Sequence, residues 1–149
     1  MSSSNSLKCV CWNIDGLASK LSDDDFIQYV QTIDIVCLIE TFLDDTFHLT
    51  NHFCDYVIYL SPAIKYSYMG RRSGGLLLLV KKRLEMFVSK IELSSEHILA
   101  LKISKELIHS DQDVVVVFVY IPPPPHHRVL CTTEVMTLTA ISLPWTAAF

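Results

Sequence analysis

Hydrophobic and polar positions come in blocks along this chain, and the first apolar block stops at two short polar side chains. Residues 8–12 have the length and bulk of a strand that is apolar on both faces, and Asp15-Gly16 after them is a turn pair. Sheet proteins tend to hold ligands and catalytic groups at the carboxyl ends of strands. We therefore expect chemistry at Asn13 and Asp15, although Asn-x-Asp-Gly is also the pattern of an ordinary turn.

The next block has the spacing of a helix. Ser22 stands before three aspartates and predicts the N-cap, with Asp25 at the capping-box position. Apolar side chains then recur at helical intervals: Phe26, Ile27, Val30 and Ile33. We expect this helix to end at Asp34.

Residues 35–39 form a short continuous apolar run of the length expected for a buried strand. A strand, a helix and a strand in succession predict two parallel strands joined by a right-handed crossover. That arrangement would bring Asn13, Asp15 and Glu40 out at the same edge of the sheet.

The rest of the hydrophobic pattern predicts mainly strands. Gly74-Gly75 indicates a turn or a close backbone approach. Residues 86–93 and 97–103 alternate as an antiparallel pair would, and residues 114–121 have the composition of a central strand. Two further strands are expected at residues 56–60 and 76–80.

Four consecutive prolines, residues 122–125, end the last strand because proline lacks the N–H that a sheet needs. Residues 129–149 contain a single charged side chain, Glu134, and no convincing periodicity. The expected organisation is a flexible amino terminus (1–6), one domain (7–123) and a poorly ordered tail (124–149).

Composition limits where the protein can be located. The longest apolar runs fall far short of the ~18 residues that span a bilayer. The amino terminus lacks a secretory signal and the five cysteines lie in apolar surroundings, so we expect buried free thiols and an intracellular location, nucleus or cytoplasm.

The net charge is −4, yet acids dominate residues 15–55 and bases dominate residues 65–105. Such a division suits a metal at one end and phosphates at the other, or simply two solvated faces.

Individual residues carry candidate chemistry. Glu40 closes an apolar strand, a position suited to Mg²⁺ but also common for a plain strand-edge glutamate. Tyr120 ends the strongest strand, so its hydroxyl either reaches the edge occupied by Glu40 or belongs to the core. Arg71 and Arg72, beside flexible glycines, suit a phosphodiester.

Two other groups of residues are weaker candidates for a functional site. Tyr66 and Tyr68 either stack on bases or cover a core edge. His48, His52 and Cys54 lack a fourth zinc ligand at a matching spacing, which favours ordinary loop residues.

Four motifs in order resemble the endonuclease/exonuclease/phosphatase superfamily, with its deoxyribonuclease-I-like α/β fold. They are residues 12–17 (WNIDGL), 34–41 (DIVCLIET), 70–75 (GRRSGG) and 119–123 (VYIPP). The third and fourth look most like the endonuclease domain of LINE-type retrotransposons.

The resemblance implies a metal-dependent phosphodiesterase that nicks DNA. Glu40 would bind Mg²⁺, with Mn²⁺ as an alternative, and Asn13 and Asp15 would support the metal and the hydrogen bonds of the site. Tyr120 would face the scissile phosphate, and Arg71 or Arg72 would contact the DNA backbone.

The chain departs from the family pattern in its second half. It has no aspartate after Asp113, no asparagine after Asn51 and no Ser-Asp-His, so the family's Asp-x-Asn and Ser-Asp-His motifs are missing. We expect the amino-terminal half of the fold, with little activity by itself. The alternatives are a non-catalytic remnant that binds nucleic acid or protein, and a hydrolase of phosphoinositides or other small phosphodiesters.

A missing half has a consequence for folding. The residues present account for roughly the first mixed sheet and one helix of a two-sheet sandwich. The inner face of that sheet would then be exposed, which predicts a protein partner or self-association to cover it.

Overall fold

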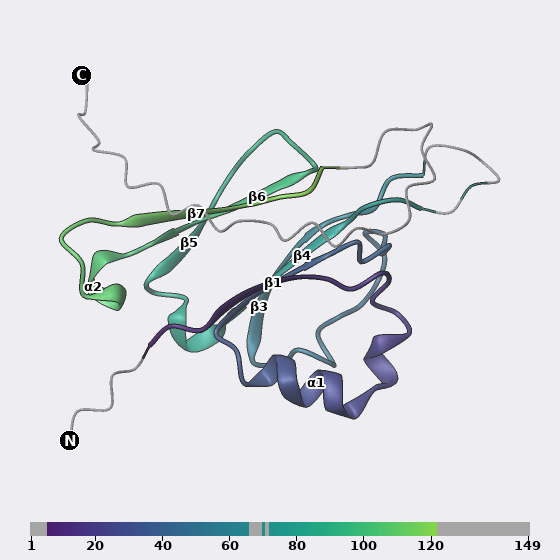
Figure 1. Cartoon of the computed structure of the whole chain (residues 1–149), viewed down its shortest axis with the longest axis horizontal. Coiled ribbons are helices and arrows are strands. Elements are labelled where there is room, and N and C mark those ends of the chain that lie inside the picture. Colours follow the sequence, from purple (N-terminus) through teal and green to yellow (C-terminus); the bar gives the residue numbers. More distant parts are fainter. Residues whose placement is uncertain (1–5, 66–69, 71, 122–149) are drawn as a thin grey trace.

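Two β-sheets face each other across an apolar core, and helix α1 (Asp24–Gln31) lies on the outer face of one of them (Figure 1). This computed structural model describes residues 6–65, 70 and 72–121. Most of the predicted flexible amino terminus and the whole of the predicted tail lie outside the described residues, so those domain boundaries stay predictions.

The first sheet has four strands in the order β1-β2-β4-β3. Their bounds are β1 Cys9–Asn13, β2 Ile35–Ile39, β3 Tyr56–Ser61 and β4 Leu76–Lys81. β1 and β2 run parallel, whereas β4 is antiparallel to both β2 and β3. The parallel pair predicted from the strand-helix-strand pattern is therefore confirmed, within a mixed sheet of an α/β fold.

Helix α1 (Asp24–Gln31) connects β1 to β2 and buries Phe26 and Val30 against the outer face of the sheet. Its N-cap is Asp23, whose carboxylate accepts hydrogen bonds from the backbone N–H groups of Asp25 and Phe26. The prediction of Ser22 as the cap is wrong, because Ser22 ends a short 3-10 helix (Lys20–Ser22) that precedes α1.

The helix also ends earlier than Asp34, at Gln31. Asp34 is buried and its carboxylate is engaged elsewhere, with the backbone N–H of Lys8 (2.9 Å) and the guanidinium of Arg83. These contacts tie the start of β1 and the segment after β4 to the residue that precedes β2.

The second sheet is antiparallel, in the order β5-β6-β7. Its strands are β5 Val88–Ile91, β6 Ile98–Ile103 and β7 Val114–Val119. The pairing of β5 with β6 confirms the predicted antiparallel pair. Two short helices in this region were not predicted, the 3-10 turn Lys82–Leu84 and α2 (Lys105–Ile108).

β7 is an edge strand of the described sheet, and the prediction of a central strand is wrong. A run of valines looks buried on both faces, but only one face of β7 meets the core. Val116 and Phe118 are buried there, whereas Val117 points to the other side and is 37% exposed.

The expectation of an uncovered inner face is also wrong. Side chains of β2 and β4 pack directly against side chains of β6 and β7, including Leu78, Leu101 and Phe118, in one buried cluster. Residues 88–119 do not extend the first sheet; they form the second sheet and cover it. The sandwich is therefore present within the described residues, though the second sheet is short.

The cysteines follow their positions in the sheets. Four of the five cysteines belong to the described residues and are free thiols: Cys37 is buried, Cys9 and Cys11 are half-buried and Cys54 is exposed. Cys131 lies outside the described residues. The prediction of burial fails for Cys54, which lies in the loop before β3. None of the helices in the described ranges is long and apolar enough to cross a membrane.

Candidate functional site

The loops that follow β1 and β2 run side by side at one end of the first sheet. Asn13 and Ile39 are partners in the parallel register, so both strands end at the same level. The N–H of Ile14 donates to the carbonyl of Ile39 (3.0 Å), and the N–H of Gly16 donates to the carbonyl of Glu40 (2.8 Å). The predicted shared edge for Asn13, Asp15 and Glu40 is confirmed.

Asn13 and Asp15 form a local turn at this edge. The Asn13 side-chain oxygen accepts a hydrogen bond from the N–H of Asp15 (3.2 Å), and both residues are exposed. Such an Asx turn is a common use of asparagine, and it explains why the strand stops here. Strand alternation puts Asn13 on the same face as Cys9 and Cys11, which pack toward the second sheet.

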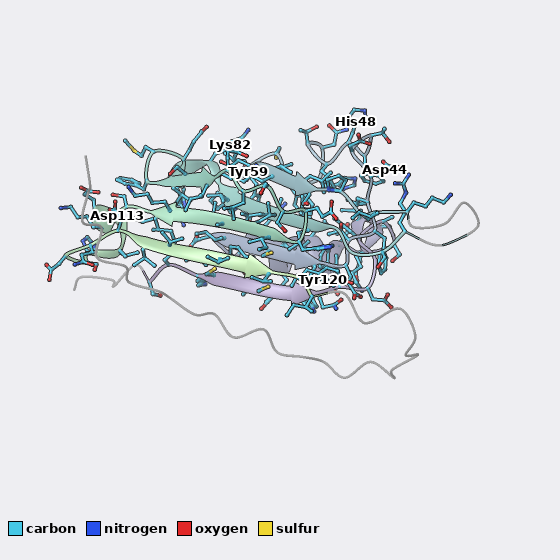
Figure 2. The ribbon with its side chains drawn as sticks, turned by 90° about the horizontal axis from the view of Figure 1, so that it is seen from above. Asp44, His48, Tyr59, Lys82, Asp113 and Tyr120 are labelled. Carbon is cyan, nitrogen blue, oxygen red and sulfur yellow. The ribbon has the colours of Figure 1, made fainter. Side chains whose placement is uncertain are left out.

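Tyr120 connects the second sheet to this edge. It follows β7, is 7% exposed, and its hydroxyl donates to Oε1 of Glu40 at 3.2 Å. Both predicted positions of Tyr120 are therefore correct: its ring belongs to the core, and its hydroxyl reaches Glu40. Tyr120 and Asp44 lie toward the same end of the molecule, opposite Asp113 (Figure 2).

Gly74 and Gly75 make the close approach that their sequence predicted. Both have positive φ angles, +73° and +88°. A Cβ on Gly74 would lie 3.0 Å from the Tyr120 ring, and a Cβ on Gly75 would lie 2.6 Å from Oγ1 of Thr41. The pair lets the chain before β4 pass between Thr41 and Tyr120 beside Glu40.

Arg72 lies near the same end but is engaged by an acid. Its guanidinium forms an ion pair with Asp44 at 2.9 Å. Hydrogen bonds from Thr46, together with the Arg72 charge, hold the pKa of Asp44 below its ordinary value. Arg71, Tyr66 and Tyr68 lie outside the described residues.

Four of the described basic residues lie at opposite ends of β4. Arg72 precedes β4, whereas Lys81, Lys82 and Arg83 come at its far end, roughly 20 Å away for a strand of this length. Lys81 lies over the Tyr56 ring (4.2 Å) and Arg83 pairs with Asp34.

The edge offers oxygen ligands of the kind that Mg²⁺ prefers. The Glu40 carboxylate is half-buried and accepts a hydrogen bond from Tyr120, and Asn13 and Asp15 stand at the same edge of the sheet with an amide and a second carboxylate. Mg²⁺ usually keeps several waters and takes one or two protein carboxylates, so this donor set fits it. No group of three or more His, Cys, Asp or Glu side chains suited to a metal occurs among residues 6–65, 70 and 72–121. The described residues would hold the ion mainly through Glu40.

Comparisons with known proteins identify the family and the fold of the chain. The model of the endonuclease/exonuclease/phosphatase family matches residues 10–136, most of the chain. The chain belongs to this family. The crystal structure of the AP endonuclease LMAP from Leishmania major superposes with a TM-score of 0.54 at 19% identity. The superposition covers 76% of this chain but 40% of that structure, and it supports the shared fold.

A second solved structure, humanised TDP2 from D. rerio, matches at 20% identity with a TM-score of 0.36. That match covers 76% of this chain and 42% of TDP2. No curated protein sequence matches the chain significantly. The chain thus spans less than half the length of these two solved structures.

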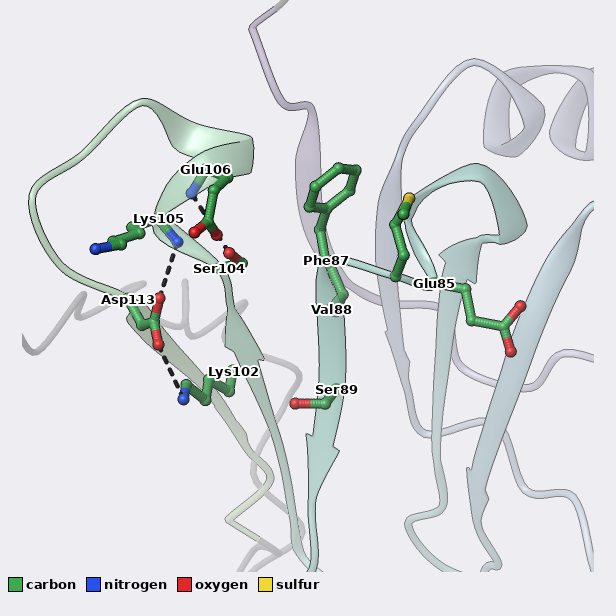
Figure 3. A pocket seen from close by; sticks show the side chains of 10 residues that line it. Glu85, Phe87, Val88, Ser89, Lys102, Ser104, Lys105, Glu106 and Asp113 are labelled. Atoms are coloured by element: carbon green, nitrogen blue, oxygen red, sulfur yellow. Dashed lines mark hydrogen bonds and ion pairs between the residues drawn. The ribbon is translucent and has the colours of Figure 1, made fainter.

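The hollow near α2 lies away from the family motifs. It encloses about 340 Å³ at the opposite end of the second sheet, where Lys102, Lys105 and Asp113 line it (Figure 3). The Asp113 carboxylate accepts hydrogen bonds from Nζ of Lys102 and the backbone N–H of Lys105, both at 2.9 Å. These contacts hold the pKa of Asp113 below its ordinary value. The hollow contains none of the predicted site residues.

Two residues at the site were missed in the sequence. Thr41 is 1% exposed, and its backbone N–H donates to the carbonyl of Gly75 (3.2 Å). His97 packs its ring against Tyr120, with the ring centroids 5.9 Å apart. The sequence could have indicated Thr41, because it directly follows Glu40. It could not have indicated His97, which is brought to Tyr120 by the pairing of β6 with β7.

Proposed function

We propose that this chain is part of a Mg²⁺-dependent DNA endonuclease of the LINE type. Glu40 is the proposed ligand of Mg²⁺, or of Mn²⁺ in its place, and Asn13 and Asp15 support the metal and its waters. Tyr120 faces the scissile phosphate. The main support is the contact between the Tyr120 hydroxyl and the Glu40 carboxylate, which joins two family motifs across the two sheets.

A bound Mg²⁺ would polarise the phosphodiester and stabilise charge that develops on its oxygens. The protein's own part is orientation. The Tyr120 hydroxyl holds one Glu40 oxygen, and the Asn13 turn fixes the backbone beside it. Arg72 contacts the DNA backbone in this proposal, which requires it to exchange Asp44 for a phosphate.

DNA is the proposed substrate because two features favour it. The motifs at residues 70–75 and 119–123 resemble LINE-type endonucleases, and one structure similar in fold is an AP endonuclease. A hydrolase of phosphoinositides or other small phosphodiesters is the alternative, and relative rates of cleavage of DNA and of these substrates distinguish the two. An intracellular location would suit a DNA substrate.

Residues 1–149 by themselves should cleave slowly. The missing Asp-x-Asn and Ser-Asp-His motifs would supply the transition-state stabiliser and the histidine system. Each group of that kind contributes ~10²–10⁴-fold to the rate. This chain should therefore bind the metal but should not turn over substrate rapidly.

The first test measures metal binding by isothermal titration with MgCl₂. Wild type should bind one Mg²⁺, and Glu40→Gln should lose most of that affinity because a carboxylate charge is removed without a change in size. Glu85→Gln, at an exposed position away from the site, is the matched control and should bind as wild type does. Equal binding by wild type and Glu40→Gln would refute the assignment of Glu40.

The second test measures nicking of a supercoiled plasmid with Mg²⁺ or Mn²⁺. Wild type should show at most a trace of nicking, and that trace should vanish in Glu40→Gln. Robust nicking that depends on Glu40 would overturn the proposed inactivity and support the proposed chemistry.

The alternative of a non-catalytic nucleic-acid binder requires a continuous basic surface. Arg72 and the cluster Lys81 to Arg83 lie at opposite ends of β4, and Arg72 and Arg83 are paired with acids. This separation favours the metal site over general nucleic-acid binding. Tight, salt-dependent DNA binding that survives Glu40→Gln would reverse that preference.

A further inference from the structure

Tyr120 is held by a histidine that no family motif contains. Ile98 and Val119 are partners in the antiparallel register of β6 and β7, so His97 and Tyr120 stand at adjacent strand ends. The N–H of Tyr120 donates to the carbonyl of His97 at 2.8 Å. The two rings meet edge to face, with centroids 5.9 Å apart and an interplanar angle of 60°.

Gly74 limits the same ring from another direction. The position of a Cβ on Gly74 would lie 3.0 and 3.4 Å from two carbons of the Tyr120 ring. The backbone of Gly74 is itself fixed, because its carbonyl accepts from the N–H of Phe42 at 3.1 Å. The ring therefore has contacts with both His97 and Gly74, while its hydroxyl meets Glu40.

The segment that carries His97 is tied to the first sheet. The carbonyl of its neighbour Glu96 accepts a hydrogen bond from the Ser61 hydroxyl at 2.7 Å, which links the end of β3 to the segment before β6. Nε2 of His97 lies 3.7 Å from the Glu96 carboxylate, longer than a hydrogen bond. The contact of His97 with Tyr120 is accordingly an aromatic ring contact.

We propose that His97 is a positioning residue for the Glu40 site. Its ring keeps Tyr120 in the orientation from which the hydroxyl donates to Glu40, and that hydrogen bond holds the carboxylate toward the metal. The effect on metal binding rests on the proposed function, whereas the effect on Tyr120 does not. Edge-to-face aromatic contacts are strong enough to change the population of one orientation by about two- to tenfold.

The test uses the full chain with ¹³C-labelled tyrosine, with the Tyr120 signal assigned from Tyr120→Phe. The Cζ shift of a tyrosine responds to the hydrogen bonding of its hydroxyl, so Glu40→Gln serves as the reference for a disturbed bond. His97→Ala should shift the Tyr120 signal in the same direction and weaken Mg²⁺ binding by about two- to tenfold. His97→Phe keeps an aromatic edge without the imidazole and should restore both. His48→Ala, a histidine in an exposed loop, should change neither.

The outcomes separate the two proposals. A Tyr120 signal that shifts in His97→Ala while wild type binds no Mg²⁺ would uphold the positioning role and refute the metal site. An unchanged Tyr120 signal in a folded His97→Ala protein would overturn the positioning role, as would failure of His97→Phe to restore it. If His97→Ala does not fold, His97→Leu fills similar space without an aromatic edge and is judged by the same signal.

Discussion

Gly75 offers the sharpest test of how the site is packed. Replacing it with alanine would place a Cβ 2.6 Å from Oγ1 of Thr41 and 3.2 Å from the backbone nitrogen of Ala63. Real Cβ atoms essentially never come within 3.0 Å of such an atom, and the buried Thr41 has little room to move away. The substitution should therefore strain the segment that immediately follows Glu40.

Two terms set the size of the effect. Holding an alanine at a φ of +88° costs about 1–3 kcal/mol, and overpacking a filled site typically costs a further ~1–3 kcal/mol. Gly75→Ala should lower the free energy of unfolding by about 2–6 kcal/mol, a large share of the ~5–15 kcal/mol typical of a domain. Gly16→Ala is the matched control: its φ is +98°, but its Cβ would approach no closer than 3.3 Å, to the side chain of Phe42. Gly16→Ala should lower the free energy of unfolding by the cost of the positive φ angle, with little added cost from overpacking.

Urea unfolding of a double-mutant cycle separates the terms. Thr41→Ala removes the Oγ1 atom, so Gly75→Ala should cost about 1–2 kcal/mol less in that background, while the φ strain remains. Additivity within about 0.5 kcal/mol would refute the predicted clash, since independent sites add to that precision. A Gly75→Ala loss no larger than that of Gly16→Ala would refute it equally.

Two further predictions concern the core and the thiols. Leu101→Ala should lower the free energy of unfolding by about 2–5 kcal/mol, because Leu101 is fully buried between the sheets. Leu93→Ala, at a 46% exposed position, should lower it far less. Equal losses would refute the packing of the second sheet on the first. Burial, with the nearby Cys11, raises the pKa of Cys9 to about 11, so at pH 8 iodoacetamide should modify the exposed Cys54 well before Cys9, as peptide mass spectrometry would detect. Because the folded state keeps the Cys9 proton that the unfolded state loses near pH 9, this contribution to stability is present below pH 9 and is lost as the pH rises toward 11; Cys9→Ala should flatten that fall.

The strands and the shared edge were predictable because they depend on local pattern. Residues 35–39 are apolar without interruption, and a helix between two strands leaves few topologies besides a parallel pair. That pair alone places Asn13 beside Glu40. The N-cap was missed by one residue because Ser22 and the three aspartates after it are all acceptable caps.

The assignment of strands to sheets was not predictable in the same way. Alternation in residues 97–103 indicates an antiparallel partner, but it does not say whether the pair extends the first sheet or covers it. Long-range pairing decides that question, and it also decides that His97 lies against Tyr120. The valine run of β7 misled for a related reason, since composition reports burial but not the number of neighbouring strands.

The polar contacts between the sheets explain why the site depends on the whole sandwich. Tyr120 to Glu40 and Ser61 to Glu96 both join the two sheets, and both lie at the end where β2 and β3 finish. Between them and the far end, the described contact is an apolar cluster, together with Nζ of Lys90 over the Tyr59 ring at 5.9 Å. Apolar packing sets the spacing of the sheets, and the two hydrogen bonds set their alignment at the site. A substitution in the cluster that leaves Glu40 untouched, such as Leu101→Ala, should therefore also loosen the Glu40 carboxylate, because the hydroxyl that holds it belongs to the other sheet.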